Sequence, residues 1–175
     1  MELMDTILNR RSVRQYNGTD ISEGVLHDIL EAGLLAPSSR NKRSVEFVAV
    51  KDKSILKSLS KAKSAGSSML EDASCAIVVI GDSEKSDVWV EDCSIALTYM
   101  MLRTTELGVA NCWVQCRRRE TENGISSETY IREHLHIPDK YGVLAVLSLG
   151  MSDETPRLHT TSEADFSKIH KDVYR

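Results

Sequence analysis

The chain has 175 residues, of which 41% are hydrophobic and 27% are charged, and its formal net charge is −4 at pH 7. This length suits one domain, expected to span residues 1–175. The negative charge disfavours general binding to nucleic-acid phosphates, which requires a basic domain. No apolar run reaches the roughly 20 residues of a membrane helix, and residues 1–14 carry charges where a signal peptide would be apolar, so we expect a cytoplasmic protein.

A basic stretch follows a short helix predicted near the N-terminus. In an extended segment alternate side chains share a face, so Arg10, Ser12 and Arg14 can converge on one site. Arg11 and Val13 then point elsewhere. Two guanidinium groups and a hydroxyl would make a phosphate clamp, because the planar fork of arginine matches phosphate oxygens. The alternative interpretation is a solvated basic turn.

The next helix is predicted to begin after a Ser22 cap and to end near Ala36, because Pro37 disfavours helical backbone in the residue before it. The loop that follows offers hydrogen-bond donors and acceptors on short side chains, including Ser38 and Asn41. Such a loop could border a flat ligand with a polar rim. A solvated turn explains the same residues.

Later elements are predicted from the pattern of apolar residues. The expected order is a strand over 45–50, a helix over 54–65, a strand over 74–80, a helix over 87–107, a strand over 109–116, a helix from Ser126 or Ser127 to Leu135, and a strand over 141–149. The run at 74–80 is apolar throughout, which indicates a central strand covered on both faces. The whole pattern predicts an α+β fold, with a mixed, largely antiparallel sheet flanked by helices.

The helix over 87–107 is the longest, with Asp87 as its expected cap and Gly108 as its expected stop. Apolar residues spread around most of its circumference, so it must be buried on nearly all sides. We therefore expect a central helix that also meets a partner subunit. A core helix buried wholly within one chain is the alternative. The polar tail from residue 151 onward stays ordered only if it lies against something, such as a partner subunit.

The cysteines and glycines argue against two kinds of site. Cys75, Cys93, Cys112 and Cys116 form no C-x-x-C pair and three lie in apolar segments, so we expect buried free thiols in a reducing compartment and no metal site. The nine glycines form neither G-x-G-x-x-G nor a P-loop motif, which argues against a dinucleotide-binding domain of the usual kind.

Several motifs together resemble the nitroreductase family of FMN-dependent oxidoreductases, and the resemblance covers almost the whole chain. Each motif is short, and the specificity lies in their order and spacing. They are Arg-Arg-Ser-Val-Arg-Gln-Tyr at 10–16, Ala-Pro-Ser-Ser-Arg-Asn at 36–41, Leu-Gly-Val-Ala-Asn-Cys-Trp at 107–113, and Ile-Pro-Asp-Lys-Tyr-Gly at 137–142, leading to Leu-Ser-Leu-Gly at 147–150.

The resemblance implies an obligate homodimer with FMN at the interface, each flavin touched by both subunits, and a tail over 151–175 packed on the partner. Arg14 would be the cation near flavin N1 and the C2 carbonyl, and would tune the flavin. No acid, base or nucleophile is required of the protein. The implied cofactor-binding residues are Arg10, Arg11, Ser12, Arg14, Pro37, Ser38, Ser39, Asn41, Trp113, Val114, Gln115, Cys116 and Arg157.

One departure from the family pattern lies beside the polar loop. Where many members have Gln-Pro-Trp, this chain has Arg43-Ser44-Val45, which leaves open the stiffness of the loop and the shape of the adjoining pocket. The chain is also short, so the excursion that covers the substrate site in longer members is expected to be reduced.

The function implied by the resemblance is an FMN-dependent oxidoreductase. It would take hydride from NADH or NADPH and reduce nitroaromatics, quinones or similar small acceptors by a ping-pong mechanism. One alternative is an FMN-binding carrier, sensor or flavin-remodelling protein without efficient turnover. Another is a regulatory domain for a different phosphorylated ligand.

Overall fold

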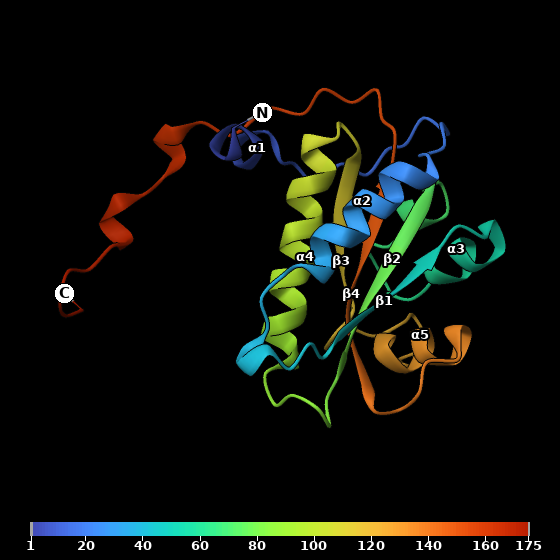
Figure 1. Ribbon diagram of the computed structural model, residues 1–175. Helices are drawn as coiled ribbons and strands as arrows, with labels where there is room; N and C mark the ends of the chain where they lie inside the picture. Colours follow the sequence, from blue (N-terminus) through green and yellow to red (C-terminus); the bar gives the residue numbers. More distant parts are fainter. Residues whose placement is uncertain (1, 175) are drawn as a thin grey trace.

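A computed structural model describes residues 2–174, and its centre is an antiparallel sheet with strand order β1-β2-β4-β3 (Figure 1). The strands are β1 (Val45–Val50), β2 (Cys75–Asp82), β3 (Ala110–Gln115) and β4 (Tyr141–Gly150). All neighbouring strands are antiparallel. This confirms the expected antiparallel character, but the sheet is not mixed as the sequence predicts, because parallel pairing among the described residues is limited to an isolated bridge between Ser12 and Asn111.

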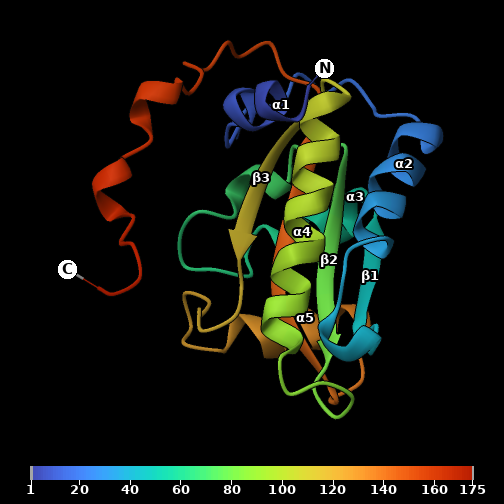
Figure 2. The same cartoon turned by 60° about the vertical axis from the view of Figure 1, so that its left-hand side comes forward.

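Residues 2–174 form five α-helices, four of which cover the sheet. They are α1 (Leu3–Asn9), α2 (Glu23–Leu34), α3 (Lys53–Leu59), α4 (Trp89–Glu106) and α5 (Ser127–Leu135). Figures 1 and 2 show α2 and α4 on one face of the sheet and α3 and α5 on the other. Each face has its own apolar core. None of the helices within residues 2–174 is long and apolar enough to cross a membrane.

Strand β2 is the buried centre of the sheet, as its apolar run predicts. All its residues are buried. Ile77 and Val79 pack toward α2 and α4, whereas Val78 and Ile80 pack toward α3 and α5. This alternation follows from the two-residue period of a strand, and it explains why no polar face interrupts the run.

Two helix boundaries differ from expectation. Asp87 does not cap α4, because the helix begins only at Trp89 and the Asp87 carboxylate pairs with Lys42 at 3.6 Å. Helix α3 ends at Leu59, well before residue 65, because the backbone tightens there into i to i−3 hydrogen bonds, from the N–H of Lys61 to the carbonyl of Ser58 and from that of Ala62 to the carbonyl of Leu59. Ser60 donates to the carbonyl of Lys57, and Ser67 donates to that of Ser60.

The C-terminal tail leaves the body of the molecule. In Figures 1 and 2 the segment after β4 crosses near α1 and then runs outward. Its crossing point is held by the backbone N–H of His159, which donates to the carbonyl of Leu8 at 3.0 Å. Farther along, apolar side chains are left open to solvent, including Phe166 at 75% and Ile169 at 62% exposure. Within one chain, the outer tail therefore has little to pack against.

Candidate functional site

The basic N-terminal segment lies along strand β3, at the edge of the sheet. Ser12 forms a parallel bridge with Asn111, and the N–H of Val13 donates to the carbonyl of Asn111 at 2.9 Å. Val13 is buried, whereas Ser12 and Arg14 are exposed. The segment therefore shows the predicted alternation, with Val13 turned into the core.

Arg10, Ser12 and Arg14 all influence the thiol of Cys112. Burial dominates and raises the pKa of this thiol, while the charges of Arg14, Lys63 and Arg10 and a hydrogen bond with Ser12 act in the opposite direction. The three residues that the sequence motif groups therefore lie near enough to act on the same side chain. Arg11 turns aside instead, with its Nη1 3.2 Å from Nε2 of His159.

Lys63 is a member of this basic patch that sequence reasoning missed. It lies in the segment between α3 and β2, and its charge also acts to lower the pKa of Cys116, which burial holds at about 12. Lys63 also borders a cavity of about 610 Å³, together with Lys61, Ser64 and Thr121. The only signal in the sequence was a second lysine in a serine- and glycine-rich stretch, which the predicted helix obscured.

Strand β3 presents backbone groups next to the patch. The Asn111 carbonyl points away from β4, because it accepts from Val13. Alternation along a strand then directs the N–H and C=O groups of Trp113 and Gln115 to the same outer edge. Their side chains are joined, with Trp113 Nε1 donating to Gln115 Oε1 at 2.8 Å. Among the predicted residues of this strand end, Val114 and Cys116 are buried in the core.

All four cysteines are free and buried, as expected. Burial raises the pKa of Cys75 to about 11 and that of Cys93 to about 12. At neutral pH these thiols therefore stay protonated and poorly nucleophilic. Free, buried thiols are what the sequence predicts for these four positions.

The polar loop containing Pro37, Ser38, Ser39 and Asn41 lies at the other end of the molecule. In Figures 1 and 2 it sits by the start of α4, far from α1 and the basic segment. Ser38 Oγ accepts from the N–H of Arg43 at 2.9 Å. The loop also borders a cavity of about 280 Å³. A single chain therefore does not bring this loop to the basic patch.

Arg157 belongs to the outgoing tail. Its side chain is 86% exposed, and its ion pair among the described residues is with Glu163 of the same tail, at 4.0 Å. The contact between tail and basic segment is made instead by His159, through Arg11. The geometry of one chain gives Arg157 no link to Arg10, Ser12 or Arg14.

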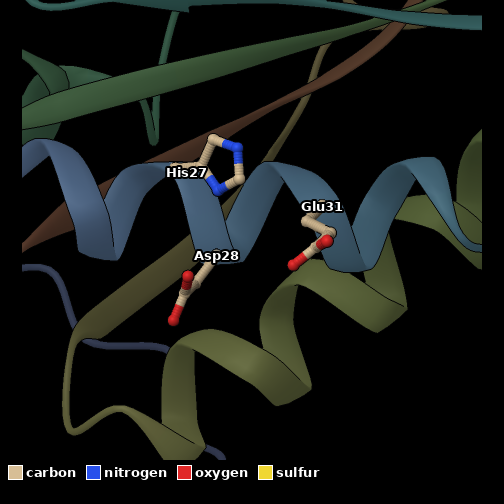
Figure 3. A group of neighbouring side chains, drawn as sticks. All are labelled: His27, Asp28 and Glu31. Atoms are coloured by element: carbon tan, nitrogen blue, oxygen red, sulfur yellow. The ribbon is translucent and has the colours of Figure 1, made fainter.

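One group of side chains in residues 2–174 has spacing that would suit a metal ion. His27, Asp28 and Glu31 project from α2, with ligand atoms within 4.8 Å of one another (Figure 3). Asp28 is already engaged, since its Oδ2 accepts from Arg103 at 2.9 Å. His27 and Glu31 are exposed, as polar residues on an outer helix face usually are. We assign no metal to this group.

Comparison with known proteins places these features in context. A model of the Nitroreductase family matches residues 7–67 and 61–151. A protein of Archaeoglobus fulgidus, provisionally named NADH dehydrogenase/NAD(P)H nitroreductase, is 35% identical over 178 residues, which cover 99% of each chain. Among solved structures, an FMN-dependent nitroreductase from Clostridium difficile R20291 matches with a TM-score of 0.95 and 41% identity, over 98% of this chain and 99% of that chain.

A second solved structure, from Bacteroides thetaiotaomicron and also provisionally named NADH dehydrogenase/NAD(P)H nitroreductase, matches with a TM-score of 0.89 and 30% identity over 98% of both chains.

Proposed function

The chain belongs to the nitroreductase family, and on that premise we propose that it is an FMN-dependent oxidoreductase. It would take hydride from NADH or NADPH and pass electrons to small acceptors such as nitroaromatics or quinones. The observation that carries the proposal is the pairing of the basic segment with β3, through the bridge between Ser12 and Asn111, which leaves Ser12 and Arg14 exposed beside the outward backbone of the strand. The similarity to an FMN-dependent nitroreductase from C. difficile supports FMN as the cofactor.

The residues of the patch suit a flavin phosphate in charge and in donor type. Arginine and serine donors would hold the phosphate and ribityl chain, and Lys63 adds a further cation. Outward N–H groups at Trp113 and Gln115 would orient the ring edge along β3. When bound, FMN would supply the hydride chemistry, which protein side chains cannot.

Arg14 would act on charge and not on protons. A fixed cation beside the pyrimidine edge stabilises negative charge that develops there during reduction. Arg14 is exposed in one chain, and its Nη1 donates to the carbonyl of Ser12 at 3.4 Å, so its guanidinium can still reach a ligand. We assign Arg14 the role of tuning the cofactor.

A homodimer is part of the proposal, because one chain separates the two halves of the site. The partner's polar loop, residues 37–41, would complete the site at the basic patch. Apolar side chains left uncovered support such an interface, including Leu3 and Met4 on α1 and Ile95 and Tyr99 on α4. The outgoing tail, 151–174, would pack on the partner and cover surface of this kind.

The decisive experiment is an absorption spectrum of the purified protein, taken before and after anaerobic addition of NADH or NADPH. Flavin bands that bleach with either donor would support the oxidoreductase. Bands that persist with both donors would favour a flavin carrier or sensor instead. If the protein shows no flavin bands even after FMN is added, the assignment of FMN as its cofactor is refuted, and the proposed function with it.

The kinetic order is a separate test. If donor and acceptor use the same open face in turn, initial rates at several fixed acceptor concentrations should give parallel double-reciprocal lines. Intersecting lines would require a ternary complex and would refute the ping-pong order. The assignment of FMN as the cofactor would not be affected.

A further inference from the structure

Asp92 is a buried carboxylate in the first turn of α4, and it accepts hydrogen bonds from two other segments of the chain, the loop before β1 and the connection between β2 and α4. It is only 3% exposed. Its Oδ1 accepts from the backbone N–H of Ser39 at 2.8 Å. Its Oδ2 accepts from the hydroxyl of Ser44 at 3.2 Å and from that of Ser86 at 3.3 Å. A buried carboxylate is costly unless donors satisfy it, and here three donors do so.

Two of these donors bracket a strained turn in the polar loop. Arg40, Asn41 and Arg43 have φ of 50°, 51° and 47°, in the left-handed region that side chains rarely adopt. Backbone of this kind persists only where the surroundings hold it. Ser39 precedes the turn and Ser44 follows it, so one carboxylate fastens both of its ends.

The hydrogen bonds to Asp92 involve the segment Arg43-Ser44-Val45, where this chain departs from the family pattern. In the pattern that the motifs resemble, a proline would stand at position 44 and its ring would fix the backbone; this chain has Ser44 there. Ser44 is 1% exposed, and its hydroxyl is committed to Asp92. The hydrogen bond therefore restrains the loop at the position where a ring would otherwise do so.

We infer that Asp92 is a positioning residue that holds loop 37–41 in the conformation in which it meets the partner's flavin. The inference rests on the proposed function, in which that loop lines the flavin site. Asp92 touches neither cofactor nor substrate in this role, and it acts through Ser39 and Ser44. Ser86 extends the same restraint to the segment between β2 and α4.

The test compares variants of the full-length protein for FMN binding, measured by fluorescence titration at a temperature where each is folded by circular dichroism. In Asp92→Ala two buried hydroxyl donors and the partly buried N–H of Ser39 lose their acceptor, and we expect the Kd for FMN to rise about 10- to 100-fold. Asp92→Asn keeps one acceptor oxygen, so its Kd for FMN should rise less than that of Asp92→Ala. Ser44→Ala should show a smaller rise with the fold intact. Asp87→Asn is the matched control, because Asp87 is a nearby carboxylate that is 81% exposed, and its Kd should stay at the wild-type value.

A second readout separates positioning from general destabilisation. With FMN saturating, the visible circular dichroism of the flavin reports the surroundings of the ring, and it should change in Asp92→Asn and Ser44→Ala but not in Asp87→Asn. Wild-type Kd and wild-type flavin dichroism in both Asp92→Asn and Ser44→Ala would overturn the inference, even if Asp92→Ala failed to fold. Failure of the proposed function is distinguishable, because wild-type protein would then bind no FMN.

Discussion

Replacement of Lys63 by glutamine tests whether the basic patch extends beyond the N-terminal motif. The change removes one positive charge and keeps a side chain of similar length. Lys63 is partly buried and close enough to Cys112 and Cys116 to act on both thiols. A sheltered hydrogen bond to a charged group contributes about 1.5–3 kcal/mol, so the Kd for FMN should rise about 10- to 100-fold. The assay is fluorescence titration of the apoprotein with FMN.

The control for this prediction is Lys61→Gln. Lys61 borders the same cavity but is exposed, and the electrostatic contributions at Cys112 do not include it. Its loss should change FMN affinity by less than about threefold, as expected for a solvated surface charge. Equal FMN affinity in the two variants would refute the placement of Lys63 in the site.

Three other predictions follow from the described contacts. Arg14→Ala should lower the reduction potential of bound FMN, because a cation that stabilises the reduced state is lost, whereas Arg14→Lys should keep a potential close to that of the wild type. Photoreduction against a reference dye measures both potentials. Equal potentials in Arg14→Ala and wild type would count against the tuning role. Deletion of residues 161–175 should shift the protein toward monomer in light scattering and weaken FMN binding, while an unchanged dimer with normal affinity would exclude the tail from the interface. The ion pair of Asp82 with Lys140, at 2.7 Å, lowers the pKa of Asp82, so its contribution to stability is present above the unfolded pKa of about 3.9 and is lost as pH falls through the lower folded value. Urea unfolding midpoints should therefore fall less between pH 5 and pH 2.5 in Asp82→Asn than in wild type, and identical slopes would argue that the pair contributes nothing.

Local patterns in the sequence predicted much of the fold. The strand over 45–50 has the expected bounds, and Ser22 caps α2 by accepting from the N–H of Val25 at 3.3 Å. These features depend on neighbours a few residues apart, which is the range that periodicity and capping rules describe. Asp87 failed as a cap because a distant lysine binds its carboxylate, and no local rule includes that competitor.

The same distinction between local and distant contacts applies to the candidate site. The motif at 10–14 could be predicted from the sequence, because alternate residues of an extended segment share a face whatever lies beside them. The sequence did not identify Lys63 and Asp92 as residues of the candidate site, because each acts mainly on residues that are distant in the chain. A signal for Asp92 did exist: an acidic residue among the apolar positions of a buried helix must find donors, although the sequence does not say which.

The sequence by itself determined which segments become strands and helices, which faces are apolar, and which family the motifs resemble, because these properties depend on short-range spacing. Only the tertiary structure decided that the basic segment pairs with β3, that Lys63 lies near it, and that loop 37–41 lies at the opposite end of the molecule. The physical reason is that strand order and register bring together groups separated by tens to over a hundred residues. Strand order and register are set by the packing of two apolar cores on one sheet, and each core is built from segments that are distant in the sequence.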